Sequence, residues 1–375
     1  MNGTTSSAEC RGAVKHRRAW AVACALGGRR SRRLSLALAC AVAAVAGLAA
    51  CGPGDSAAPG GSGGSSGAIT IGKAVDTIGF TTVDVAKSKG YFSKEGVTVN
   101  EDLLSGSSTA FAALQSGSVN FVTASSTALI SAKEKGLPLE AVASLDYGVS
   151  LQLLVSDTWI KSHGLSPNQP LSTVMRKMQG AKLGILSTTD QTYDQYLEDQ
   201  AGVSSSKFTY VKIDSQSAAL AAVKYGEIDA FLLSPPSTYY AQSQGGAEVI
   251  ASLHEVPKLA NMAYDILVVD SAWAKSHSSE VTKVATAMAM ADNTMRSKPQ
   301  SVLAAEQQHY PTMASSVLLN SLQHVTFAPD GQFTPAMWQA ALTEYNQTES
   351  NAASSVNAST GGGMWTNQYI DKSGL

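Results

Sequence analysis

Five short polar segments follow apolar stretches of this sequence, and their residue types suit the binding of a small molecule. They are Asp76-Thr77, Ser105-Gly106-Ser107-Ser108, Ser125-Ser126, Ser187-Thr188-Thr189-Asp190 and Ser234-Pro235-Pro236. Hydroxyl groups and backbone N–H groups at the start of a helix can donate hydrogen bonds to an anion or to a neutral polar ligand. Any one segment is more simply explained as a helix cap, so a binding site requires all five to meet at one cleft.

Charged and aromatic residues narrow the class of ligand. After residue 51 the sequence keeps only two arginines, Arg176 and Arg296, and both lie in segments expected to be exposed helix. A bidentate arginine clamp on a carboxylate or sulfonate is therefore not expected. Asp76 and Asp190 would also repel an anion at the predicted cleft. The aromatic residues that could stack on a flat ring are Phe80, Tyr147, Tyr193 and Tyr264. These features favour a neutral or amine-bearing organic ligand over nitrate or sulfate.

The sequence offers little for catalysis or metal binding. The histidines after residue 51 are scattered, at His163, His254, His277, His309 and His324. None pairs in sequence with a nucleophile or with a second metal ligand. Asp146-Tyr147 could form a catalytic pair, although hinge residues are the simpler interpretation. We therefore expect no catalytic residue, no metal site and no cofactor.

The N-terminal segment has the composition of an export signal. Residues 1–50 carry eight Lys and Arg against one acid and end in an apolar run. This pattern is typical of a signal peptide, and the run is short and Ala-rich for a permanent membrane span. LAACG (48–52) resembles the lipobox of bacterial lipoproteins, which implies cleavage before Cys51 and attachment of a lipid to its thiol. Sec and twin-arginine export both stay open.

The segment after the predicted cleavage site reads as a tether. Residues 51–68 are rich in Gly, Ser and Pro and are expected to be flexible. Cys51 would be the only cysteine left after cleavage, which leaves no disulfide and no catalytic thiol. Without residues 1–50 the chain carries 19 Lys and Arg against 28 Asp and Glu, a formal charge of −9. This charge argues against nucleic acid and against an anionic membrane surface as partners.

Strand-like and helix-like segments alternate from residue 69 onward, and the pattern starts again near residue 181. Such alternation predicts mainly parallel sheets flanked by helices. We expect an α/β protein of two lobes joined by two crossover strands. The predicted boundaries place lobe 1 with the C-terminal helices at 69–156 plus 262–375, and lobe 2 at 157–261.

One phrase occurs in both predicted lobes, as AALQSGSVNFVTASSTA (112–128) and AAVKYGEIDAFLLSPPS (221–237). In each copy a glycine, Gly117 or Gly226, is expected to end a helix. An Asn or Asp three residues later opens an apolar strand, and that strand leads to a polar helix start. A repeat of this kind predicts two similar units, whose polar tails face each other across the cleft.

Several motifs between residues 69 and 269 resemble one family of transport proteins. VAKSKGYFSKEGVTV (85–99) is similar to its A-x-x-x-G-[FY]-F-x-x-x-G-[VL]-x-V signature, and the repeated phrase is similar to its twin A-L-x-x-G-x-[IV]-D motifs. MQGAKLGILS (178–187) resembles the entry to its second lobe. The family is the nitrate/sulfonate/taurine and thiamine-precursor group, or THI5-like group, of ABC-importer solute-binding lipoproteins. Asn120 departs from the Asp usual at that position.

The resemblance implies a two-lobed periplasmic-binding-protein fold of type II. It also implies an extracytoplasmic, lipid-anchored protein that traps a small organic molecule or anion between its lobes. Hinge closure would then deliver the ligand to ABC permease subunits driven by a cytoplasmic ATPase. A monomer is expected. Two alternatives stay open: a lipid-anchored enzyme of precursor biosynthesis on the same fold, and a sensor lipoprotein without an importer.

The residues expected to bind the ligand come from the polar segments and from the aromatic set. They are Asp76, Thr77, Phe80, Ser105, Gly106, Ser107, Ser125, Ser126, Tyr147, Thr188, Thr189, Asp190, Ser234 and Tyr264.

Overall fold

A computed structural model describes residues 68–167, 169–186, 188–348 and 363–370 of the protein. All of these residues belong to one structural unit, Gly63–Leu375. The predicted signal peptide at 1–50, the lipidation site Cys51 and the tether up to residue 67 lie outside the described residues. Among those described, no helix has the length and apolar character needed to cross a membrane.

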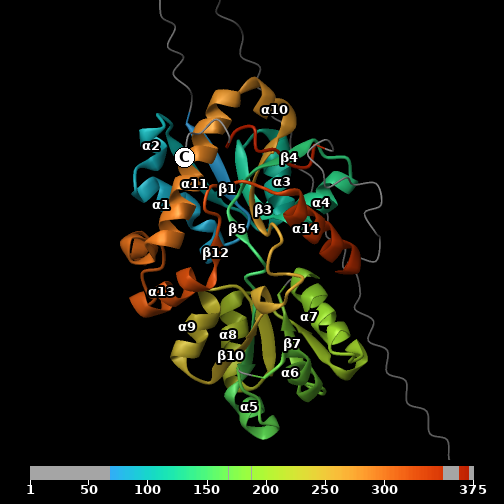
Figure 1. The fold of residues 1–375 in the computed structure, drawn as a ribbon. Coiled ribbons are helices and arrows are strands. Elements are labelled where there is room, and N and C mark those ends of the chain that lie inside the picture. The colour runs from blue at the N-terminus through green and yellow to red at the C-terminus, as the bar shows by residue number, and fades with distance from the viewer. Residues whose placement is uncertain (1–67, 168, 187, 349–362, 371–375) are drawn as a thin grey trace, which may run out of the picture. The chain divides into compact units, whose positions relative to one another are not determined.

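The first of two five-stranded sheets has the strand order β2-β1-β3-β11-β4 (Figure 1). β1 pairs in parallel with β2 and β3, whereas β11 runs antiparallel to both β3 and β4. Val, Ile and Ala fill the central strands, whose faces are almost entirely buried, as expected for a sheet covered on both sides. The strands are β1 Ile69–Lys73, β2 Val99–Leu103, β3 Phe121–Ser125, β4 Leu139–Ser144 and β11 Asp265–Asp270.

The second sheet repeats this plan with the order β10-β6-β9-β7-β8. β7 pairs in parallel with β8 and β9, and β6 runs antiparallel to β9 and β10. The strands are β6 Gln152–Ser156, β7 Lys182–Ile185, β8 Thr209–Lys212, β9 Ala230–Leu233 and β10 Ala247–Ser252. A small ladder of β5 Asp146–Tyr147 with β12 Thr326–Phe327 precedes the crossing from the first sheet to the second.

The predicted lobe boundary after residue 156 is wrong by one strand. β6 was expected in the first lobe, but it pairs with β9 and β10 of the second sheet. The chain therefore enters the second lobe at Gln152. The apolar run 151–155 carries no signal of which sheet it joins, because a buried strand looks the same in either. The chain returns to the first sheet at Asp265, the first residue of β11.

Helices cover both sheets, as the alternation of segments predicted (Figure 1). In the first lobe these are η1 Ile78–Phe80, α1 Thr82–Ser88, α2 Tyr91–Lys94, α3 Ser107–Ser116, α4 Ser126–Glu134, α10 Ser271–Ser276 and α11 Ser278–Ser297. In the second lobe they are α5 Asp157–His163, α6 Leu171–Lys177, α7 Thr188–Gln200, η2 Ser205–Lys207, α8 Gln216–Tyr225, α9 Ser237–Gln244 and η3 Leu253–Glu255.

The C-terminal helices contact both lobes. They are η4 Pro299–Val302, α12 Leu303–His309, α13 Ser315–His324 and α14 Pro335–Thr348. α12 packs on α1 of the first lobe, while α13 contacts α9 and α14 contacts both α4 and α7. The Met and Trp residues of this region, including Met288, Trp338 and Trp365, lie in the hydrophobic core, as expected from their helical spacing.

The repeated phrase performs the same structural task in each lobe. Gly117 and Gly226 both end a helix in the left-handed conformation, with φ of 73° and 76°. The Asn120 side chain accepts a hydrogen bond from the backbone N–H of Thr70, at the start of β1, over 2.8 Å. Asp229 accepts one from the N–H of Lys182, at the start of β7, also over 2.8 Å. Only an acceptor oxygen is required here, which explains why Asn can stand for Asp.

Candidate functional site

A cavity of about 590 Å³ lies between the two lobes, with residues of both in its walls. The first lobe supplies the loop after β1, the loop after β2, the start of α4 and the start of β11. The second lobe supplies the end of β9, the β7–α7 turn and the first residue of α8. The lining residues are Val75, Thr77, Phe80, Ser105, Gly106, Ser107, Ser108, Ser125, Thr127, Ala128, Ser131, Leu151, Leu186, Thr189, Asp190, Gln216, Leu233, Ser234, Tyr264, Asp265 and Tyr345.

Most of the predicted ligand-binding residues line this cavity. They are Thr77, Phe80, Ser105, Gly106, Ser107, Ser125, Thr189, Asp190, Ser234 and Tyr264. They meet there because the carboxyl ends of the parallel strands lie at one edge of each sheet, and these two edges face the same cleft. The predicted residue Thr188 is the first residue of α7, and its side chain lies outside the described part of the chain.

The start of α3 lines the cavity without a side-chain cap. Its N-cap, Gly106, has a φ of 92° and provides no side-chain cap, so no side chain occupies the first N–H groups of the helix. This backbone conformation requires glycine. In contrast, the first turn of α4 is capped internally, because the Ser125 hydroxyl accepts the N–H of Ala128 at 3.2 Å. Ser125 therefore serves the helix as well as the cavity wall.

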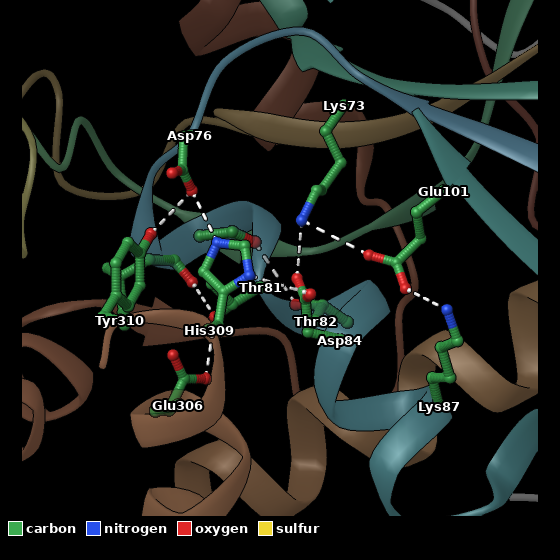
Figure 2. Close-up of polar contacts among 12 residues, drawn as sticks. Lys73, Asp76, Thr81, Thr82, Asp84, Lys87, Glu101, Glu306, His309 and Tyr310 are labelled. Carbon is green, nitrogen blue, oxygen red and sulfur yellow. Dashed lines mark hydrogen bonds and ion pairs between the residues drawn. The ribbon is translucent and has the colours of Figure 1, made fainter. Parts of the chain in front are cut away.

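Asp76 was expected in the cleft but is bound elsewhere. Its Oδ1 accepts hydrogen bonds from His309 Nε2 at 2.8 Å and from the Tyr310 hydroxyl at 2.9 Å. Figure 2 shows the carboxyl group directed at these two side chains. Burial alone would raise the pKa of Asp76, but these hydrogen bonds and the charge of His309 bring it below its ordinary value. Asp76 thus fastens the loop after β1 to the C-terminal helices.

The same network extends along α1 and β1 (Figure 2). His309 Nδ1 lies 3.1 Å from Asp84, and Lys73 Nζ lies 2.7 Å from the other oxygen of Asp84. The hydrogen bonds to Asp76 and Asp84 raise the pKa of His309 to about 10. Burial would raise the pKa of Asp84, but His309 and Lys73 lower it to about 2. The sequence did not predict a role for His309, because its ion-pair partners Asp76 and Asp84 lie more than 220 residues away in the chain.

Two further predicted residues do not line the cavity. The Ser126 hydroxyl donates to the carbonyl of Ala263 and is fully buried. Tyr147 is half-buried in the β5–β12 ladder. Tyr193, suggested as a stacking partner, is buried beside Glu344 in the core. The burial of Ser126 and Tyr193 depends on the packing of the lobes, which local sequence does not reveal.

Asp265 is a lining residue that the sequence analysis missed. The sequence predicts ligand-binding residues at the carboxyl ends of parallel strands. β11 runs antiparallel to β3, so the first residue of β11, and not the last, lies at the cleft edge. A Cβ on Gly79 would fall 2.3 Å from Asp265 Oδ2 and 3.1 Å from Asp146 Oδ2. Gly79 therefore leaves the space that this buried pair of acids occupies. Burial raises the pKa of Asp265 to about 7.

Other lining residues also escaped prediction. Leu151, Leu186 and Leu233 give the cavity an apolar wall, and Tyr345 comes from the distant helix α14. Gln216 lies shortly after β8, whereas the predicted ligand-binding segments of the second lobe follow β7 and β9. Arg176 and Arg296 are exposed, as expected, and neither lines the cavity.

The lobes also touch directly beside the cavity. The N–H of Ile78 donates to the carbonyl of Pro235 at 3.1 Å, and the hydroxyls of Ser150 and Ser234 lie 2.9 Å apart. Ile78 belongs to the first lobe and Pro235 to the second. A few hydrogen bonds of this type can form or break when two lobes move about a hinge.

Comparisons with known proteins agree with this architecture. Residues 77–302 match the family described as NMT1/THI5 like. No curated protein matches the sequence. Among solved structures, the periplasmic nitrate-binding protein of Synechocystis superposes with a TM-score of 0.66 at 12% identity, covering 82% of this chain and 88% of that one.

Two further structures give similar values. The ligand-binding component of an ABC-type import system from Staphylococcus aureus, solved with zinc bound, has a TM-score of 0.64 at 15% identity and covers 82% of this chain and 98% of its own. The periplasmic aliphatic sulphonate binding protein of Escherichia coli has a TM-score of 0.58 at 19% identity, with coverage of 74% and 85%. The fold is therefore that of the periplasmic binding proteins, as predicted.

Proposed function

Since this chain belongs to the NMT1/THI5-like family, we propose that it is the solute-binding protein of an ABC importer. It traps a small molecule between its lobes and delivers that molecule to a membrane permease with a cytoplasmic ATPase. The observation that carries the proposal is the cavity of about 590 Å³, whose walls come from both lobes. A volume of this order suits a small organic ligand.

The proposal includes the location of the protein. Residues 1–50 act as a signal peptide, lipid on Cys51 anchors the protein outside the cytoplasm, and residues 51–68 form the tether of a monomer. Replacing Cys51 by Ala is expected to release the protein from the membrane fraction into the soluble fraction. Retention of the Cys51→Ala variant in the membrane would contradict the lipid anchor without touching the solute-binding role.

The proposed role is binding without catalysis. The described residues that line the cavity include no His, Cys or Lys. Nowhere among the described residues do three or more His, Cys, Asp or Glu side chains form a group that could hold a metal ion. The buried acids Asp146 and Asp265 offer a proton site, and the Ser, Thr and Tyr hydroxyl groups of the lining suit hydrogen bonds to a solute. Chemical conversion of a bound solute during incubation, detected by mass spectrometry, would overturn this part of the proposal.

A thermal-shift screen tests solute binding directly. The purified protein is heated with thiamine precursors, flavins, sulfonates, nitrate and amines in turn. A ligand at a hundred times its dissociation constant stabilises a protein by about 2.7 kcal/mol, which gives a clear rise in melting temperature. Asp199→Asn, on the exposed side of α7, is the control variant and should respond like the wild type. A protein to which no small molecule binds would contradict the proposal.

A further inference from the structure

The charged side chains that line the cavity are both acidic. Asp265 comes from β11 of the first lobe and Asp190 from α7 of the second, and they are 5% and 7% exposed. Among the described lining residues there is no Lys, Arg or His. An ionised carboxylate in a buried position is stabilised by a nearby opposite charge, so this lining favours a positively charged group.

Asp265 lies beside a second buried acid. Among the described residues, the side chain that shares a hydrogen bond with its carboxyl group is another acid, Asp146. The second oxygen of Asp146 has no hydrogen-bond partner among those residues, and burial together with the nearby acids Asp265 and Asp292 raises the pKa of Asp146. Two adjacent carboxyl groups repel when both ionise, and a cation placed against them relieves that repulsion.

Asp190 lies at the start of helix α7, where the helix would otherwise attract an anionic ligand. It lies in the first turn of α7, and its Oδ2 accepts the N–H of Leu186 at 3.1 Å. The partial positive charge at the start of α7 is therefore already met by a carboxylate of the chain itself. An anion that approached this helix from the cavity would encounter Asp190 first.

The other polar groups of the cavity suit the opposite end of the ligand. The uncapped start of α3, at Gly106 to Ser108, offers N–H donors to a hydroxyl, carbonyl or other acceptor. Phe80 and Tyr264 also line the cavity, together with the apolar side chains of Leu151 and Leu233. An organic body of modest size fits such a wall better than a bare inorganic ion.

We infer that the ligand of this cleft is an organic amine, whose protonated nitrogen binds Asp265 of the first lobe and Asp190 of the second. The inference rests on the proposed function and names its ligand class. A cation held by one carboxylate from each lobe also links binding to closure, because both contacts form only when the lobes come together. Nitrate and sulfonates without an amine lack the group that these acids bind.

Matched pairs of small molecules test the inference. Tyramine is compared with tyrosol, putrescine with butanediol, and taurine with isethionate, because in each pair a hydroxyl replaces an amine. Nitrate and sulfate complete the panel. Thermal shift and calorimetry on the purified full-length protein are expected to detect one or more amines and none of their alcohol partners. Binding that is equal within each pair, or that is limited to the anions, would overturn the inference.

Single substitutions separate the acid pair from general effects on the fold. Asp265→Asn and Asp190→Asn are expected to weaken binding of the amine by at least about tenfold, while Asp199→Asn leaves it unchanged. Melting temperatures of the free variants show whether each has folded. Asp265→Asn should melt no lower than the wild type, because it removes a buried charge beside Asp146. Unchanged affinity in both folded variants would overturn the inference.

The outcomes distinguish failure of the ligand class from failure of the proposed function. Binding of nitrate or isethionate, strengthened by Asp265→Asn, would preserve a solute-binding protein and exclude the amine. Absence of binding by every member of the panel would count against the amine, and absence across the wider solute screen would count against the proposed function as well.

Discussion

At the scale of single residues, the cleft depends on the space beside a buried pair of acids. Gly79 follows the predicted ligand residue Thr77 in the chain, yet its importance is not visible in sequence. The backbone φ of Gly79 does not require glycine. Glycine is needed at this position because the carboxyl groups of Asp265 and Asp146 approach its Cα too closely for a side chain. Ten of the fourteen residues predicted to bind the ligand line the cavity, because strand ends and helix starts are readable as local patterns. It missed Asp265 because the direction of β11 depends on its neighbours in the sheet.

Gly79→Ala is expected to disturb the acid pair. The new methyl group would fall 2.3 Å from Asp265 Oδ2, so the carboxyl group or the helix must shift. The expected loss of stability is about 1–3 kcal/mol, measured by urea unfolding, with weaker solute binding. In an Asp265→Ala background the same substitution should cost clearly less. An equal cost in both backgrounds would show that the clash with Asp265 is not its cause.

At the scale of elements, the repeated phrase fixes the first strand of each lobe. The sequence predicted the glycine helix ends and the core strands of both copies, and these predictions are confirmed. It did not predict that Asn120 and Asp229 each bond the N–H of a strand some 50 residues away. Contacts over such separations depend on the fold, and no local pattern encodes them.

Asn120→Ala should destabilise the protein, whereas Asn120→Asp should not. The Ala variant leaves the half-buried N–H of Thr70 without its acceptor, at an expected cost of about 1 kcal/mol in the free energy of unfolding. Asp supplies an equivalent oxygen, as Asp229 does in the second lobe. Chemical denaturation of the two variants and the wild type decides the matter. A similar loss in both variants would mean that the amide N–H₂ group of Asn120 matters instead.

The attachment of α12 to the first lobe is expected to depend on pH. His309 has a pKa of about 10 in the folded protein, above its unfolded value of about 6.5. Its contribution to stability is therefore complete below about pH 6.5 and is lost as pH rises toward 10. We expect His309→Leu to lower stability at pH 6 by about 1 kcal/mol and to reduce the decline between pH 6.5 and 10.

His277→Leu is the matched control for this effect. His277 stacks on Trp273 with ring centroids 4.4 Å apart and forms no ion pair within the described chain. Its replacement is expected to leave the slope of stability against pH unchanged in this window. A slope that is unchanged in His309→Leu would contradict the role assigned to the network of Asp76 and Asp84.

At the scale of the whole molecule, two similar lobes enclose one cavity and the C-terminal helices contact both. The alternation of segments and the repeated phrase were sufficient to predict two α/β lobes. The sequence could not predict that β6 joins the second sheet, nor that α13 and α14 contact the second lobe. The local sequence of these segments does not indicate which element each one packs against. The proposed function belongs to this scale, since neither lobe alone can enclose a ligand.

The distance between the lobes, with and without solute, tests the central claim most directly. Spin labels on Asp102→Cys in β2 and Asp214→Cys after β8 occupy exposed sites, one on each lobe. Trapping of an amine from the panel predicts a shorter and narrower distribution of distances between the labels. A solute that raises the melting temperature but leaves this distribution unchanged would contradict the claim that the protein closes on its ligand.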